Sequence, residues 1–369
     1  MRWPRTLSLY VAREIVAYTL LGLLAISMVM VTRSLVRVLD DLLGAGFRFE
    51  DLATVLGLLT SILALYALPV SFLFGVLLAM GRMAADVEII AMRACGVGIR
   101  GLLLPVGLLG LVLSAATLQL SLEAEPAARR GMAAAVRTMV LRGASVEPGR
   151  FNTIGERTVW VDERRDRRLR GIVIADRSDP ERPFVVFAES GEMELDEERA
   201  EFLLRLERGD VHIEGGGSEE RYQRLTFERF EYRFDVDALV GNGGSRRPRE
   251  MELDELRETV KRIEAGAATG SLREVPASYP VHLQQRWAMP MAPALFALVG
   301  VPLGMQRKRG ARSWGVILCA VLAFGYYALQ SFGELLAIES GFPPAIVWMP
   351  NVIYGALGVV LLTRAHRAS

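Results

Sequence analysis

Apolar residues gather in six long runs that contain no charged side chain, and these runs dominate the pattern of the chain. A helix that crosses the hydrocarbon core of a bilayer needs about 20 apolar residues. The runs occupy residues 15–32, 52–81, 101–122, 287–306, 313–333 and 340–363. Each run is close to that length or longer, so the pattern predicts six transmembrane helices.

The first run could also belong to a cleaved signal peptide. It is longer than the apolar part of a usual signal peptide, however, and it continues into Arg33 and Arg37 without a small-residue cleavage site. We therefore expect a membrane helix that the protein retains.

The stretch between the third and fourth runs has a different pattern, with dense charge and alternating apolar residues. Alternation is typical of strands with one buried face. The expected strands are 158–161, 171–174, 184–187, 202–206, 211–213 and 230–234. Turn signals are expected to separate them at 179–180, 190–191, 208–210 and 215–217. This spacing predicts an all-β domain, a sandwich or jelly roll, whose open edge would be ready to pair with another sheet.

A helical pattern follows the predicted strands, after a flexible joint at 241–245. Its apolar positions recur at helical spacing within residues 251–265: Leu253, Leu256, Val260 and Ile263. We expect an amphipathic helix, either packed on the protein or lying at the membrane surface, and we favour packing.

The charged segment 81–98, GRMAADVEIIAMRACGVG, separates the second and third runs. At helical spacing its apolar positions fall on one face: Val87, Ile90, Ala91 and Ala94. Asp86 has Arg82 four residues before it, whereas Glu88 has no basic residue three or four positions away. Two interpretations stay open: the segment is an ordinary solvated loop, or it is a docking helix whose unpaired Glu88 carboxylate binds another protein.

Basic residues in the short loops predict the orientation, because lysine and arginine are enriched on the cytoplasmic side. The loop between the fourth and fifth runs contains Arg307, Lys308, Arg309 and Arg312. The next loop has two glutamates and no basic residue, and both termini are basic. Both termini and segment 81–98 are therefore expected in the cytoplasm, and the β-rich stretch outside it. The first outer loop is the weak point, since it carries Arg33, Arg37 and Arg48 against four acidic residues, but the other loops outweigh it.

Composition supports a membrane protein and excludes several other classes. Hydrophobic residues make up 51% of the 369 residues, mean hydropathy is +0.29, and a net charge of +1 gives no attraction to nucleic acid. The two cysteines, Cys95 and Cys319, and the three histidines lack disulfide or metal-site spacing.

Motifs for catalysis are missing as well. The sequence contains no GxxxxGK[ST], GxSxG or HExxH motif, so we expect no cofactor, no metal and no enzyme activity. The runs lack the ionisable residues on which ion-coupled transporters depend. The pattern fits a subunit of a larger machine that obtains its energy from another chain.

Arg33 and Arg37 stand at the outer end of the first run. They can anchor the helix by extending their charged heads into the interface. Alternatively, their guanidinium groups can bind anionic head groups or phosphates. The sequence leaves both roles open.

Three stretches resemble the LptF/LptG permeases of the lipopolysaccharide exporter. They are EIIAMRACG at 88–96, WAMP at 287–290 with VPL at 301–303, and NVIY at 351–354. The order of three helices, an outer β-rich domain and three helices also matches, so the resemblance covers nearly the whole chain. LVRVL at 35–39 and RACG at 93–96 look closer to LptF. Val87 departs from the serine that the family often has before the glutamate, which puts the helix cap in question.

The resemblance implies a permease subunit of an ABC transporter that extracts lipopolysaccharide from the bacterial inner membrane and passes it to a periplasmic bridge. The implied partners are an LptB-like ATPase dimer, a second LptF/LptG-type permease and an LptC-like periplasmic protein. Glu88 matches the acidic residue that docks on the ATPase, with Asp86 and Arg93 in the same coupling segment. Arg33 and Arg37 match the region that faces lipid A phosphates.

The resemblance also implies a division into domains. Residues 1–122 would hold three transmembrane helices and the cytoplasmic coupling helix 82–98. Residues 123–285 would form a jellyroll-like periplasmic β domain with the linker helix 251–265, and residues 286–369 the last three transmembrane helices. Two other functions stay open: a non-transporting scaffold whose β domain recruits periplasmic proteins, and a mechanotransmitting permease that moves its outer domain without carrying lipid.

Overall fold

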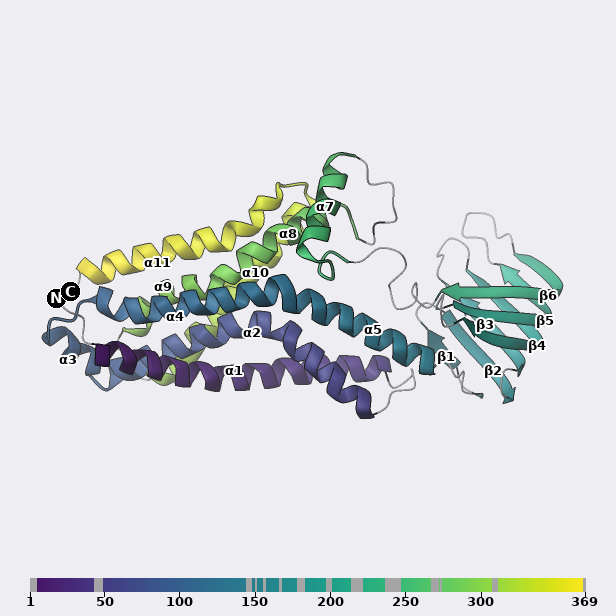
Figure 1. Cartoon of the computed structure of the whole chain (residues 1–369), viewed down its shortest axis with the longest axis horizontal. Helices are drawn as coiled ribbons and strands as arrows, with labels where there is room; N and C mark the ends of the chain where they lie inside the picture. Colours follow the sequence, from purple (N-terminus) through teal and green to yellow (C-terminus); the bar gives the residue numbers. More distant parts are fainter. Residues whose placement is uncertain are drawn as a thin grey trace. The chain divides into compact units, whose positions relative to one another are not determined.

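The computed structural model describes residues 5–42, 49–143, 148–149, 151–154, 157–165, 168–177, 183–196, 201–213, 222–235, 247–266, 272, 274–306 and 311–367. The chain divides into two compact units, which are described separately (Figure 1). The helical unit comprises Met1–Ser34, Gly57–Arg130 and Arg247–Ser369. The sheet unit comprises Leu35–Leu56 and Gly131–Arg246.

Six helical segments among the described residues are long and apolar enough to cross a membrane, which confirms the prediction from the uncharged runs. Most are continuous helices: α1 (Arg5–Leu42), α2 (Phe49–Ala85), α4 (Ile99–Gln119), α10 (Ala311–Glu339) and α11 (Met349–Arg367). The fourth segment joins α8 (Ser278–Ala288) to α9 (Ala292–Gly304) through the short helix η2 (Met289–Met291). A second short helix, η3 (Pro344–Trp348), precedes α11.

Helices continue beyond the uncharged runs. Helix α1 includes Arg33 and Arg37, and α4 passes through one π-helical segment, η1 (Leu120–Ala124), into α5 (Glu125–Gly143). Helical hydrogen bonds close between residues four apart and do not depend on side-chain polarity, so a helix can extend past the apolar stretch.

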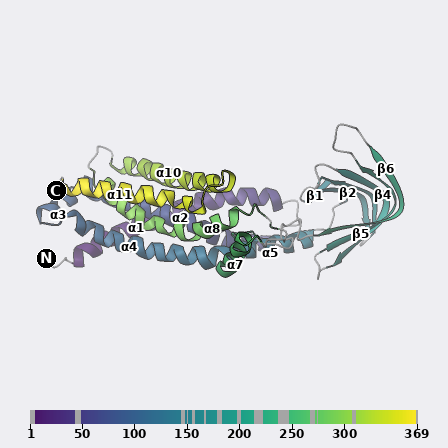
Figure 2. The same cartoon turned by 90° about the horizontal axis from the view of Figure 1, so that it is seen from above.

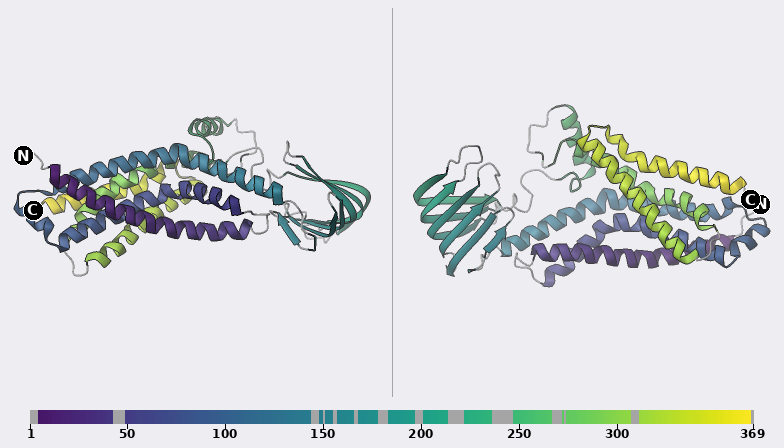
Figure 3. Two further views of the ribbon diagram at one scale, coloured as in Figure 1. Left: turned by 60° about the horizontal axis from the view of Figure 1, so that its bottom comes forward. Right: turned by 180° about the vertical axis from the view of Figure 1, so that it is seen from behind.

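Two apolar clusters hold the helical unit together. One joins α1, α2, α4 and α9, and its fully buried members include Val11, Ile15, Phe72 and Leu102. The other joins α2, α9, α10 and α11 around Phe296 and Tyr326. Figure 3 shows α1 running along one side of this bundle.

The predicted amphipathic helix is α7 (Leu253–Glu264). Its buried residues Leu256 and Val260 share a cluster with Tyr279 of α8. The apolar face therefore packs on the chain itself, which confirms the favoured of the two expectations.

The sheet unit contains one antiparallel sheet of six described strands, in the order β1-β2-β3-β4-β5-β6. They are β1 (Phe151–Ile154), β2 (Arg157–Arg165), β3 (Arg168–Asp176), β4 (Phe184–Asp196), β5 (Glu201–Ile213) and β6 (Gln223–Asp235). The expectation of a β domain between the third and fourth helical segments is confirmed. Each described strand pairs only with its neighbours in sequence, so the described connections form a meander without the crossover of a Greek-key jelly roll.

Two predicted turns are wrong. Ser190 and Gly191 lie inside β4, and residues 208–210 lie inside β5, which unites the two strands expected at 202–206 and 211–213. Glycine within a strand often marks a close approach of another chain segment. A Cβ on Gly209 would stand 2.0 Å from the Phe187 carbonyl oxygen, and one on Gly191 2.8 Å from Ile172 Cδ1. The turn signals at 179–180 and 215–217 and the joint at 241–245 lie outside the described residues.

The sheet curves strongly (Figure 2). The strand pairing skips one row of residues across five strands without a change of register: Asp162, Gly171, Glu189, Arg208 and Glu228. Two members of this row have positive φ, 60° at Gly171 and 51° at Arg208. We call this row the bend line, because such departures from extended geometry let strands turn together.

Candidate functional site

The charged segment between the second and third membrane helices forms a short helix, α3 (Glu88–Ala94). Helix α2 ends at Ala85, and the chain reverses at Val87, whose φ of 64° is rare for a β-branched residue. Val87 gives α3 no side-chain cap, as its departure from serine suggested.

The end of α3 is well defined by a glycine. Gly96 has φ 82°, its N–H donates to Arg93 O at 2.9 Å, and the N–H of Val97 donates to Met92 O at 3.0 Å. This pair of bonds is a Schellman motif, in which a left-handed residue closes the helix. The segment is therefore an ordered helix with fixed ends rather than an irregular loop.

The two faces of α3 differ in exposure. Ile89 is 4% exposed and, with Met92, packs against the core shared by α1, α2, α4 and α9. On the other face Val87 is 41% and Ile90 50% exposed. Ala91 and Ala94 are exposed as well, so the apolar face expected from the sequence is the one that the chain leaves uncovered.

Glu88 is not the bare carboxylate that its own helix suggested. The Tyr10 hydroxyl of α1 donates to Glu88 Oε2 at 2.9 Å, and Arg82 Nη2 of α2 lies 3.8 Å from Glu88 Oε1. The expected pair of Arg82 and Asp86 is present at 3.5 Å. Spacing within one helix missed the partners of Glu88, because one of them is 78 residues away and the other lies across the reversal at Val87.

Arg93 lies on the last turn of α3, where a positive charge is favourable to the helix dipole. Its side chain is partly exposed, and its Nε is shielded without a hydrogen-bond partner in the described part of the chain. The structure thus places all three expected coupling residues, Asp86, Glu88 and Arg93, at or beside α3.

Arg33 and Arg37 lie one helical turn apart in α1, at the opposite end from Tyr10. The Arg33 side chain is exposed, and the side chain of Arg37 lies outside the described residues. Along α1 they lie far from Tyr10, so they are treated as a separate candidate region.

A second polar cluster, which the sequence analysis missed, joins α8 to α10 and to the residues before α7. Glu334 of α10 accepts hydrogen bonds from Arg249 at 3.3 Å and from Gln285 at 2.9 Å. The buried Arg286 donates to the carbonyls of Pro248 at 3.0 Å and Met251 at 2.5 Å. These bonds attach the residues just before α7 to the membrane helices α8 and α10. The sequence feature that could have predicted this cluster is the group of polar residues just before the fourth uncharged run.

The sheet unit buries one apolar face, which includes Val161, Ile172 and Ile174. Within it, Asp176 accepts a hydrogen bond from Arg157 Nε at 2.8 Å and another from the Tyr232 hydroxyl. Burial and the bond to the Asp176 carboxylate raise the pKa of Tyr232 above its ordinary value. The phenol thus stays neutral at physiological pH and serves as a donor.

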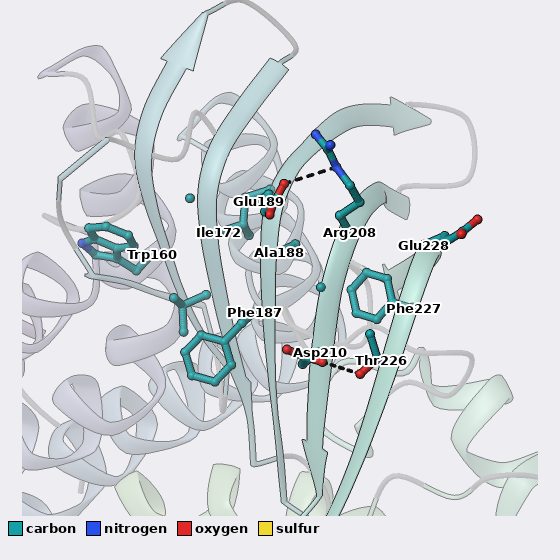
Figure 4. Close-up of a pocket in the computed structure, with 13 residues that line it drawn as sticks. Trp160, Ile172, Phe187, Ala188, Glu189, Arg208, Asp210, Thr226, Phe227 and Glu228 are labelled. Atoms are coloured by element: carbon teal, nitrogen blue, oxygen red, sulfur yellow. Dashed lines mark hydrogen bonds and ion pairs between the residues drawn. The ribbon is translucent and has the colours of Figure 1, made fainter.

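An open hollow of about 610 Å³ follows the bend line of the sheet (Figure 4). Trp160 and Phe187 line its apolar part, and Arg208 pairs with Glu189 at 3.2 Å on its polar side. Asp210 accepts hydrogen bonds from Arg224 and Thr226, each at 2.7 Å, which hold the pKa of its carboxyl below the ordinary value.

Comparison with known proteins covers nearly the whole chain. Residues 9–364 match the family described as lipopolysaccharide export system permease LptF/LptG. A search among curated proteins finds no match to this chain. The family match spans both the helical unit and the sheet unit, with α3 and its partners inside it. The chain therefore belongs to the LptF/LptG family of lipopolysaccharide export system permeases.

Proposed function

We propose that α3 is the coupling helix through which a separate ATPase drives this permease, with Glu88 as its main polar contact and Asp86 and Arg93 beside it. The observation that carries the proposal is the uncovered apolar face of α3 next to a carboxylate that is 29% exposed. An exposed apolar patch rimmed by charge is typical of a protein interface.

The permease needs such a contact for its energy. As a permease subunit of the lipopolysaccharide ABC exporter, the chain is not an enzyme, and its sequence has no P-loop. Energy from ATP must enter through a partner chain. The partner can shift the permease between two states only if it binds them with different affinity, so α3 must be held differently in each state.

The proposed complex contains an LptB-like ATPase dimer, a second LptF/LptG-type permease and an LptC-like periplasmic protein. We propose that this chain is the LptF-type member, on the strength of the residues at 35–39 and 93–96. It would lie in the bacterial inner membrane with both termini in the cytoplasm and its β domain in the periplasm, as the basic loops favour. Arg33 and Arg37 would face the phosphates of the lipopolysaccharide.

Affinity co-purification of the tagged chain from detergent tests this proposal. We expect an ATPase and a second permease to co-purify, and Glu88→Lys to remove most of the ATPase because it replaces an acceptor with a like charge for a basic partner. Glu264→Lys, a reversal at an exposed position of α7, is the matched control and should retain the ATPase.

Normal ATPase recovery with Glu88→Lys would contradict the docking role of Glu88. Recovery of periplasmic proteins alone, under conditions that preserve other ABC complexes, would favour the scaffold function instead.

A further inference from the structure

Arg82, near the end of α2, contacts α1, the turn that follows α2, and α3. Its Nε lies 2.8 Å from Glu14 Oε1 of α1, and its Nη1 lies 3.5 Å from Asp86 Oδ2. Its Nη2 donates to the Tyr10 hydroxyl at 2.9 Å and lies 3.8 Å from Glu88 Oε1. A guanidinium carries five N–H donors in one plane, so it can serve more than one of these neighbours at a time.

The Tyr10 hydroxyl completes this arrangement, because it accepts from Arg82 and donates to Glu88 Oε2 at 2.9 Å. One oxygen of the Glu88 carboxylate is therefore engaged. The other stands 3.8 Å from Arg82, which is beyond hydrogen-bond range. The side chain of Glu88 is 29% exposed. The carboxylate is thus oriented by the chain and still able to accept a donor from outside.

Close packing holds α1, which carries Tyr10 and Glu14, against α2, which carries Arg82. A Cβ on Gly75 of α2 would stand 2.1 Å from Thr19 Oγ1 and 2.9 Å from the Ile15 carbonyl oxygen. Val11 and Ile15 of α1 are also fully buried in one core with Val76 of α2. The two helices therefore approach closely along the turns that lead to Arg82.

We propose that Tyr10 and Arg82 are positioning residues that hold the Glu88 carboxylate ready for a cationic group of the ATPase and tie α3 to the first two membrane helices. The inference rests on the proposed coupling function of α3. A displacement of α1 along α2 would move the Tyr10 hydroxyl and so reorient Glu88. The contact would thereby give the partner the state-dependent binding that coupling needs.

Tyr10→Phe tests the inference, since it removes one hydroxyl and leaves the ring. The full-length permease complex in nanodiscs is titrated with the ATPase subunit that co-purifies with it, and the dissociation constant is measured. We expect binding about threefold to tenfold weaker, the range for loss of one hydrogen bond to a partly exposed charged group. Tyr18→Phe, two turns further along α1, is the control and should change binding less than twofold.

A double-mutant cycle with Glu88→Ala asks whether Tyr10 acts through Glu88. In the Glu88→Ala background, Tyr10→Phe should add less than a twofold change, because the acceptor is already gone. An equal loss in both backgrounds would overturn the inference and give Tyr10 a merely structural role.

Hydrogen exchange of the α3 amides gives a reading that does not depend on the ATPase. Tyr10→Phe should speed exchange from Ile89 to Val97 in the permease alone, and unchanged exchange would count against the tie to α1. If Glu88→Ala weakens binding while Tyr10→Phe does not, this inference fails and the proposed function stands. If neither change weakens binding, the docking role itself is overturned, and the inference falls with it.

Discussion

At the scale of single residues, the backbone of Val87 is the unusual feature of the coupling segment. It adopts a left-handed conformation, which costs a β-branched residue on the order of 1–3 kcal/mol. Strain of this kind persists only where the surroundings enforce it, and here the helix core holds both sides of the reversal through Ala84 and Ile89. The reversal sets where Glu88 stands relative to Arg82.

Val87→Asn should relieve this strain, because asparagine enters the left-handed region more readily. The α3 amides of the full-length permease should then exchange about fivefold more slowly, as a gain of about 1 kcal/mol in local stability predicts. Ile90→Asn is a matched control on the same exposed face, where the backbone is helical. Faster exchange in Val87→Asn than in the native chain would show that the valine side chain itself stabilises the reversal.

The partners of Glu88 mark the limit of what the sequence predicts at this scale. The residue types, the exposed face of α3 and the pair of Arg82 with Asp86 all followed from local spacing. Tyr10 could not be found in that way, since its position next to Glu88 depends on how α1 packs on α2. Long-range packing of this kind is set by side-chain fit between helices, which one sequence does not display.

At the scale of elements, the membrane helices were predictable and the strand ends were not. Uncharged runs locate membrane helices because placing a charged side chain in the hydrocarbon core costs several kcal/mol of free energy. In the sheet, Gly191, Arg208 and Gly209 read as turn residues but lie within long strands. Within a strand, glycine can allow the close approach of a neighbouring strand. Positive φ values at Gly171 and Arg208 also occur without ending β3 or β5.

Gly171→Ala should test the bend line. Gly171 has φ 60°, and an added Cβ would stand 2.8 Å from the Cβ of Asp162 on the neighbouring strand. We expect a loss of about 1–2 kcal/mol in local stability, measured as faster hydrogen exchange of β2 and β3 in the full-length chain. Val173→Ala, on the partly exposed face nearby, is the control for side-chain size. Equal protection in Gly171→Ala and the native chain would show that the bend does not require glycine.

At the scale of the whole molecule, the proposed regions for energy input and for cargo are distinct. Helix α1 carries Tyr10 near one end and Arg33 and Arg37 towards the other, so one continuous helix includes both candidate regions. In lipid, every backbone hydrogen bond of such a helix is satisfied internally, which makes it a stiff element. We therefore expect changes at the arginine end to alter the response of the ATPase to lipid, while the ATPase stays bound.

Arg33→Ala with Arg37→Ala separates anchoring from phosphate binding. In proteoliposomes that contain the full exporter, the double variant should need about tenfold more lipopolysaccharide for half-maximal stimulation of ATP hydrolysis, which corresponds to two exposed ion pairs of about 0.5–1 kcal/mol each. Raised salt should reduce the difference, because exposed charge pairs are screened. Arg13→Ala, exposed near the other end of α1, should leave the stimulation unchanged. Normal stimulation of the double variant would assign both arginines to anchoring, since an anchor supports the helix without recognising the lipid.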